Sequence, residues 1–463
     1  MRTILISTAL LNGTQTLAHE YRVSIDDDLE RLEVEARFDT KVTSVRARSQ
    51  SADRYVHDIR DCETNDRLRT NGRRLQLPDD GIRCLRYEVD LLDAARDERR
   101  NSALVDSNVV VSPAAWFWRP PLRGDDEITV RFTNTDSINV SVPWLPVDGE
   151  PNTYRLTASP ESARAPAVFG DFDYVERDID GATLRITLLK PYGRLGRDSI
   201  VDWVVQTAGS INLAADRFPN PSPTVVVVPV GRSSWSDSPV PFGRVIRDGG
   251  ETIELFINQD RPIGDFYDDW TATHEFSHLM LPYVRSRHRW VSEGFATYYQ
   301  NVLLARAGQY TQQRAWQRLY EGFERGRGSR PEMSPNDAAS KRRGTMKIYW
   351  SGAAIALMAD VELRRRSNGE QTLDSVLREL ASCCLPSERS WSGPELFETL
   401  DRYVDEPLFM PLYRRYANSP GFPDYRATFD ELGVRVSNGR VALEDRGTGA
   451  ALRKSITGVP AGR

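Results

Sequence analysis

The stretch that organises this chain reads Trp270-Thr-Ala-Thr-His274-Glu275-Phe-Ser-His278-Leu-Met-Leu. In a helix, positions 274 and 278 lie about 40° apart on one face, because each residue turns the helix by about 100°. Two imidazole nitrogens can then converge on one tetrahedral metal ion. A carboxylate at position 275 can take a proton from a water on that ion. The pattern predicts a zinc hydrolase site, with His274 and His278 as ligands and Glu275 as general base.

Glu293 is the candidate third ligand. The fourteen residues between His278 and Glu293 include Pro282, which should end the first helix just before it. A second helix from Trp290 to Ala307, stopped by Gly308, would carry Glu293 on its first turn. Three protein ligands and one open position are typical of a catalytic zinc site, and we expect one zinc ion per chain. The alternative is a surface helix in which the two histidines are hydrogen-bonded and the glutamate is only a cap.

Several further segments continue the pattern. They are Trp290-Val-Ser-Glu293-Gly-Phe-Ala-Thr-Tyr-Tyr, Leu303-Leu-Ala-Arg-Ala-Gly308, Tyr349-Trp-Ser-Gly352-Ala, 361–369, 372–377 and Asp430-Glu-Leu-Gly-Val-Arg-Val436. With the histidine motif, they resemble the glycyl aminopeptidase family, relatives of aminopeptidase N in the gluzincin clan. The similarity covers most of residues 200–436. It implies a thermolysin-like, mostly helical catalytic domain that acts on peptide or protein substrates.

The resemblance also implies a role for Tyr349. In the family pattern, a tyrosine at this place donates its hydroxyl to the oxyanion that develops on the substrate. A phenol aimed at that charge would complement the metal. From the residues alone, a tyrosine packed in the core is the alternative.

One segment departs from the family. Relatives carry a Gly-Gly-Leu-Glu-His-like sequence whose glutamate binds the free amino group of the substrate. The comparable place here reads Phe-Gly243-Arg244-Val-Ile, with no carboxylate. The runs 242–247 and 252–258, separated by the turn formers at 248–250, predict a hairpin just before the histidine motif. We expect Gly243 and Arg244 to lie on its first strand, which borders the cleft and binds extended substrate. An amine without an anionic partner pays a desolvation penalty, so we predict that strict amino-terminal trimming is lost, unless Glu251 or Glu254 supplies the anchor.

The first part of the chain has a different pattern of apolar and polar residues. From Glu20 to about Lys190, apolar and polar residues alternate in short runs separated by turn formers, which is typical of an antiparallel β-sandwich. The predicted fold class is therefore α+β and multidomain. We expect a possible signal peptide at 1–18, the β-sandwich at 19–190 and the catalytic domain at 191–436. Residues 437–463 should form a polar tail, which is too short for the PDZ domain that many relatives carry.

The amino terminus and the cysteines bear on the compartment. A short apolar run from Ile4 to Leu11, followed by small residues, is typical of a secretory signal, although an ordinary first strand is the alternative. No other stretch is long and apolar enough to cross a bilayer. Cys62 and Cys84 could form a bridge that suits an exported protein, periplasmic or extracellular, whereas neighbouring cysteines such as 383 and 384 seldom bridge each other.

Charge and composition narrow the function further. The 61 basic and 66 acidic residues are intermixed, and the net charge of −5 is small for 463 residues, so the sequence does not predict nucleic-acid binding. The interpretation that remains is a zinc metallopeptidase. Its rival is a zinc-retaining but inert module that binds peptides or proteins. Glu275 argues against the rival, because a binding module has no need of a general base.

Overall fold

The computed structural model describes residues 18–97, 103–123, 126–157, 165–234, 236–247, 250–387 and 389–458. Residues 1–17, which carry the expected signal segment, lie outside this range. The chain divides into two compact units. Unit 1 comprises 1–97, 114–136 and 144–158, and unit 2 comprises 98–113, 137–143 and 159–463.

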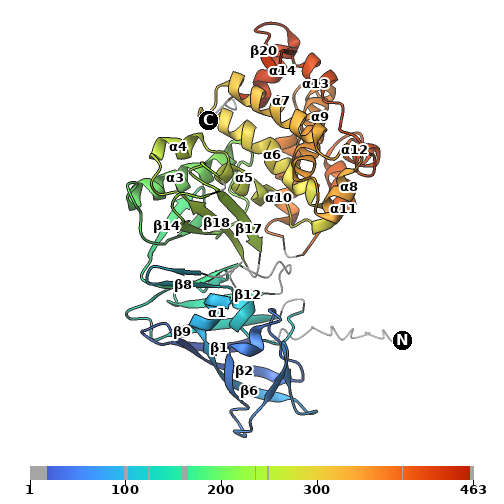
Figure 1. Ribbon diagram of the computed structural model, residues 1–463. Helices are drawn as coiled ribbons and strands as arrows, with labels where there is room; N and C mark the ends of the chain where they lie inside the picture. The colour runs from blue at the N-terminus through green and yellow to red at the C-terminus, as the bar shows by residue number, and fades with distance from the viewer. Residues whose placement is uncertain are drawn as a thin grey trace, which may run out of the picture. The chain divides into compact units, whose positions relative to one another are not determined.

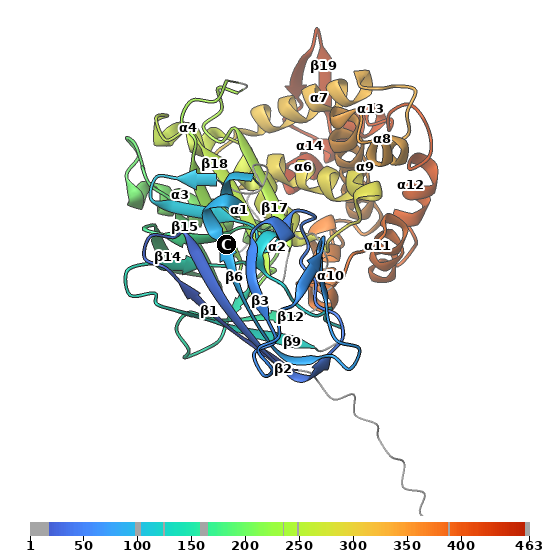
Figure 2. The same ribbon diagram turned by 60° about the horizontal axis from the view of Figure 1, so that its bottom comes forward.

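Unit 1 is built on a seven-stranded sheet with the order β11-β12-β9-β1-β2-β6-β3. Its strands are β1 (Ala18–Ile25), β2 (Arg31–Val42), β3 (Val56–Arg60), β6 (Ile82–Asp90), β9 (Glu127–Thr133), β11 (Leu145–Pro146) and β12 (Thr153–Thr157). A short hairpin, β4 (Arg69–Asn71) and β5 (Arg74–Gln76), and helix α1 (Leu91–Asp97) complete it. Side chains along β1 and β2 alternate between buried and exposed, as the period-two pattern predicts. Figure 2 shows β1, β2 and β6 of this sheet.

Besides a small hairpin near its end, the described part of unit 2 contains two sheets. The five-stranded sheet has the order β14-β15-β16-β18-β17, and the four-stranded sheet has the order β10-β13-β8-β7. The strands are β7 (Ala103–Val105), β8 (Asn108–Val111), β10 (Asn139–Ser141), β13 (Ala167–Gly170), β14 (Asp173–Ile179), β15 (Ala182–Leu188), β16 (Thr224–Pro229), β17 (Phe242–Arg247) and β18 (Glu251–Ile257). The hairpin predicted just before the histidine motif is β17–β18.

The unit boundary differs from the expected domain boundary at residue 190. Strand β15 pairs in parallel with β16, so β14 and β15 belong to the same sheet as the strand that borders the site. The alternating pattern identifies a strand but carries no information on its partner. The residues expected to form one β-rich domain are therefore divided between two compact units.

The rest of unit 2 is helical (Figure 1). Its helices are α3 (Arg197–Gly209), α4 (Ile263–Asp268), α5 (Thr271–Ser277), α6 (Arg289–Arg306), α7 (Gln312–Gly328), α8 (Pro335–Lys341), α9 (Thr345–Arg366), α10 (Leu373–Cys384), α11 (Gly393–Leu400), α12 (Phe409–Tyr416), α13 (Arg426–Glu431) and α14 (Thr448–Thr457). Helices α6, α7 and α9 lie side by side in the figure and pack on one another. One continuous apolar core joins these helices to the five-stranded sheet. None of the helices in the described ranges is long and apolar enough to cross a bilayer.

The expected polar tail is folded over most of its length. A small hairpin, β19 (Val434–Ser437) and β20 (Arg440–Leu443), precedes α14. The side chain of Arg306 on α6 donates to the carbonyl of Ile456, and Trp316 on α7 donates to Thr457. Ala450, Arg453, Ile456 and Thr457 are buried on one helical face, and because only two of them are apolar, the polar composition of the segment hides this signal.

Both cysteine pairs are bridged. Cys62 and Cys84 form the disulfide that the sequence suggests. Cys383 and Cys384 are also joined, contrary to the expectation for neighbouring cysteines. This second bridge lies at the last turn of α10, where the chain leaves the helix through the extended residue Leu385.

Candidate active site

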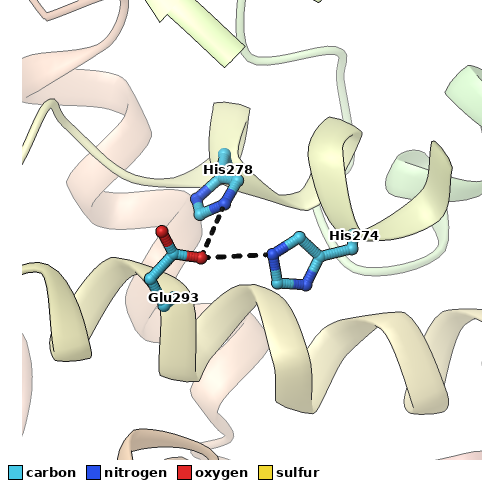
Figure 3. Close-up of side chains that lie close together, drawn as sticks. All are labelled: His274, His278 and Glu293. Atoms are coloured by element: carbon cyan, nitrogen blue, oxygen red, sulfur yellow. Dashed lines mark hydrogen bonds and ion pairs between the residues drawn. The ribbon is translucent and has the colours of Figure 1, made fainter. Parts of the chain in front are cut away.

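The two histidines of the motif and Glu293 converge on one point. His274 lies on α5, and His278 is the first residue of the 3-10 turn that follows α5. This turn ends before the extended residue Leu281. In Figure 3 both imidazole rings point toward the carboxylate of Glu293, which comes from the neighbouring helix α6. One carboxylate oxygen, Oε2, lies 3.3 Å from His274 Nε2 and 3.5 Å from His278 Nε2. One donor atom from each of the three residues lies within 4.8 Å of the others, so a single small ion could touch all three.

Gln300 orients the first histidine. Its side-chain oxygen Oε1 lies 2.8 Å from His274 Nδ1, and both side chains are buried. Because an amide oxygen only accepts hydrogen bonds, Nδ1 carries a proton, so in the neutral ring Nε2 is the nitrogen with the lone pair, and only the protonated imidazole can donate from Nε2 to Glu293. Gln300 stands two helical turns after Glu293 on α6, on the same face. That spacing is the signal by which the sequence could have revealed it.

Glu275 lies against the edge strand of the sheet. The backbone N–H of Val245 on β17 donates to its carboxylate. A Cβ atom added to Gly243 would come within 2.7 Å of Glu275 Cγ, so glycine is required for this close approach. Strand β17 pairs only with β18 within the sheet. Because alternate residues of an antiparallel strand direct their N–H and C=O groups to the same edge, Gly243 shares with Val245 the edge turned away from β18.

Tyr349 packs on the same histidine. Its ring stacks on that of His274, with centroids 5.5 Å apart and planes 14° from parallel. Its hydroxyl is hydrogen-bonded to Glu293. Tyr349 therefore does more than fill the core, because its phenol group reaches the cluster of candidate ligands.

A contact between two glycines places Tyr349 beside Glu293. Helices α6 and α9 cross at Gly294 and Gly352, where a Cβ on Gly294 would lie 2.2 Å from the Cα of Gly352. A Cβ on Gly352 would lie 2.1 Å from the carbonyl oxygen of Trp290. Neither distance is possible for a real side chain, so the two backbones are in direct contact only because both residues are glycine. Glu293 precedes one of these glycines by one residue, and Tyr349 precedes the other by three.

The electrostatics of the cluster follow from burial and from its own hydrogen bonds. Burial opposes the charged form of Glu293, but hydrogen bonds with His274 and His278 outweigh it and hold the pKa of Glu293 well below its usual range. Burial raises the pKa of Glu275, against the opposing effect of the two imidazoles. Burial, followed by the nearby carboxylates, raises the pKa of Tyr349, so its phenol remains a hydrogen-bond donor.

Two arginines of β17, Arg244 and Arg247, pair with the two glutamates of β18. Arg244 donates to the buried carboxylate of Glu254 directly opposite it. Glu251 is buried and pairs with Arg247, and it also accepts a hydrogen bond from Asn220. Both glutamates are therefore engaged by arginines, so neither offers a free carboxylate as the alternative amine anchor considered from the sequence.

Arg247 is a structural residue that the sequence did not point to. One of its guanidinium nitrogens, Nη2, donates to the carbonyls of His278 and Leu281, at 3.0 Å each. These carbonyls lie at the end of the 3-10 turn, where the N–H of Leu281 already donates to the carbonyl of His278 and Arg247 adds a second donor. The side chain thus ties the second histidine to the sheet.

The connection between the two site helices contains a buried histidine. His288 is buried, and its ring lies edge-on to Tyr413, 6.5 Å from centroid to centroid. Burial lowers its pKa. Its ring packs against Tyr413 on α12, and it is not one of the three residues that converge on the candidate metal position.

Comparisons with known proteins agree with this geometry. The family model of the M61 glycyl aminopeptidases matches residues 280–355, a range that includes Glu293 and Tyr349. No curated protein matches the chain in sequence.

Solved structures resemble the chain over most of its length. An aminopeptidase N family protein from Idiomarina loihiensis has a TM-score of 0.66 at 14% identity, over 90% of this chain and 79% of that one. An M1 zinc metallopeptidase from Deinococcus radiodurans has a TM-score of 0.54 at 12% identity, over 89% and 96% of the two chains. A mutant of the same enzyme, bound to a Tyr-Ser-Ala substrate, has a TM-score of 0.52 at 12% identity, over 89% and 97%. At these identities the likeness concerns the fold. The resemblance to the glycyl aminopeptidase family is thereby confirmed, in sequence over residues 280–355 and, over most of the chain, in a fold shared with aminopeptidase N zinc metallopeptidases.

Proposed function

We propose that this protein is a zinc-dependent metallopeptidase of the gluzincin type, in which a β-sandwich precedes a thermolysin-like catalytic domain. The observation that carries the proposal is the convergence of His274, His278 and Glu293 next to the carboxylate of Glu275. The family match and the shared fold support it. The bridge between Cys62 and Cys84 supports export from the cytoplasm, where such bonds are rare.

The residues present fit zinc. Two imidazole nitrogens and one carboxylate oxygen form the donor set of many catalytic zinc sites, and they suit zinc better than magnesium or calcium, which prefer oxygen ligands. The hydrogen bond from His274 to Gln300 fixes the tautomer that a ligand needs. When bound, the metal would polarise the scissile carbonyl and lower the pKa of a water molecule.

The side chains around the metal position would carry the proton transfers. Glu275, held by the N–H of Val245, accepts the proton of the attacking water and delivers it to the leaving amine. The Tyr349 hydroxyl donates to the oxyanion of the substrate carbonyl. Its raised pKa keeps the proton on the phenol while that charge develops.

Strand β17 would hold the substrate backbone. The edge that carries Gly243 and Val245 would offer an extended peptide those backbone groups that Glu275 does not engage, and the peptide would add to the sheet as a further strand. Arg244 would stiffen that edge through its pair with Glu254. Because β17 provides no carboxylate for an amino terminus, we propose that internal bonds and blocked peptides are cleaved at least as well as free amino termini.

Digestion of a peptide library, with and without a chelator, tests the function. We expect new fragment ends by mass spectrometry in the untreated sample only, together with one zinc per chain by elemental analysis. Zinc at that level without any cleavage would favour the inert binding module. Absence of zinc after incubation with the metal would remove the site altogether.

A further inference from the structure

Arg289 is a cation without a partner at the edge of the candidate active site. It is the first residue of α6, one helical turn before Glu293 on the same face. Its side chain is partly buried, and its Nε atom is fully buried without a hydrogen-bond partner among the described residues. Its charge acts on Tyr349. Arg289 therefore lies near both residues that would surround the reacting carbonyl.

The lack of a partner is unusual for a guanidinium in this position. Within the described part of the chain, no carboxylate lies within ion-pair distance of Arg289, whereas both arginines of β17 are engaged. Arg244 pairs with Glu254, and Arg247 pairs with Glu251. A buried donor that stays unsatisfied is destabilising, and its presence at a candidate active site points to a ligand that satisfies it.

The charges of the site point to the sign of that ligand. The carboxylates of Glu275 and Glu293 would balance a divalent metal held by neutral histidines, which leaves the charge of Arg289 uncompensated. No free carboxylate near β17 offers a place for a substrate ammonium group, since Glu251 and Glu254 are both paired. The site is therefore prepared for an anionic group of the substrate and not for a cationic one.

We propose that Arg289 binds a carboxylate of the peptide substrate and so makes this site select for an acidic group near the scissile bond. The proposal rests on the proposed function and gives it a substrate class. A planar guanidinium suits a carboxylate because two parallel N–H groups can meet its two oxygens. The carboxylate comes either from the carboxyl terminus of the peptide or from an aspartate or glutamate side chain, and the two sources can be separated by experiment.

Binding to an inactive background tests the proposal without relying on turnover. The parent is the zinc-loaded Glu275→Gln variant, into which an acetylated tripeptide with a free carboxyl terminus and the same peptide amidated are titrated calorimetrically. We expect the acid to bind about tenfold to a hundredfold more tightly than the amide, the usual worth of a charged hydrogen-bonded pair. Adding Arg289→Gln should bring the two affinities to within about twofold. Two further amidated peptides, one with glutamate and one with glutamine beside the scissile bond, report on the side-chain source.

Two controls make the result specific. Arg287→Gln removes the same charge from an exposed arginine two residues away, and it should leave the preference unchanged. Arg289→Lys keeps the charge without the planar fork and should retain part of the preference, which also covers the case in which Arg289→Gln fails to fold.

The outcomes separate this proposal from the general function. Equal binding of acid and amide by the parent overturns the role of Arg289 but leaves a peptidase site. An acid preference that survives Arg289→Gln assigns the carboxylate to the metal and also overturns it. If no peptide of either kind binds to zinc-loaded protein, both this proposal and the peptidase assignment fail.

Discussion

Helix α6 carries two buried charged clusters that differ in one respect. The candidate site, at its beginning, brings together three metal-ligating groups, and no arginine or lysine of the described residues pairs with them. The second cluster, at its end, joins Arg306 to Asp374 at 2.8 Å and Arg364 on α9 to Asp360 at 3.0 Å. The hydroxyls of Tyr298 and Tyr299 donate to the same two carboxylates. The second cluster balances its own charges, whereas the first is complete only with an ion from outside. A buried cluster whose charges balance one another is typical of a structural role. A cluster that lacks a counter-charge is typical of a binding or catalytic site.

The largest effect should follow from changing the base of the open cluster. Glu275→Gln keeps the shape of the side chain but cannot accept a proton, so we expect turnover to fall on the order of 10⁴-fold. Zinc content by elemental analysis should stay at one per chain, because this residue is not a ligand. Undiminished hydrolysis by this variant would mean that a contaminant performs the cleavage.

The closed cluster should respond in stability instead. Asp374→Asn leaves Arg306 buried without its counter-charge, and we expect the free energy of unfolding to fall by about 3–5 kcal/mol in denaturant titration. Zinc per folded chain should not change. Asp216→Asn, which breaks an exposed pair with Arg378, is the matched control and should cost about 1 kcal/mol or less. A similar loss in both variants would contradict the contrast between the buried cluster and the surface.

Tyr349→Phe should have an intermediate effect on turnover. The phenyl ring can still stack on His274, but the oxyanion loses one donor, which typically costs about a hundredfold to a thousandfold in kcat. The change should leave stability and zinc content as they are. Tyr174→Phe, which removes an exposed hydroxyl, provides the control. Equal turnover of both variants would show that Tyr349 has a packing role only.

The smallest effect concerns the amino terminus of the substrate. Since β17 carries no free carboxylate, acetylation of a peptide should change kcat/KM by no more than about threefold, or about 0.7 kcal/mol. The measurement compares one peptide with its acetylated form. Loss of cleavage on acetylation would establish an aminopeptidase and would require an amine anchor elsewhere.

Local features of the site were predictable from the sequence. Pro282 ends the first site helix, and Gly308 follows the second, which runs from Arg289 to Arg306 against the predicted Trp290 to Ala307. Period-two alternation identified the strands, and the hairpin before the motif forms as expected. These features depend on neighbouring residues, whose effects the sequence displays directly.

Features that depend on distant partners were not predictable. The pairing of β15 with β16 moved the unit boundary, and the packing of α14 on α6 turned an expected tail into a folded segment. In the sequence, Arg289 is indistinguishable from other arginines at helix ends. Only the structure shows that its Nε atom is buried without a hydrogen-bond partner among the described residues. Each of these properties is set by what lies opposite a residue in space, which a single sequence does not specify.

The crossing at Gly294 and Gly352 limits how this protein can evolve. Both positions already hold the smallest residue, so a side chain gained at one cannot be compensated by a loss at the other. Any substitution there would separate the two helices and carry the phenol of Tyr349 away from Glu293. Residues at the rim of the site can therefore be substituted one at a time. The distance between the Tyr349 phenol and the Glu293 carboxylate depends on both glycines together and cannot be changed in that way. New substrate preferences should arise on strand β17 and at the start of α6, and not at the crossing.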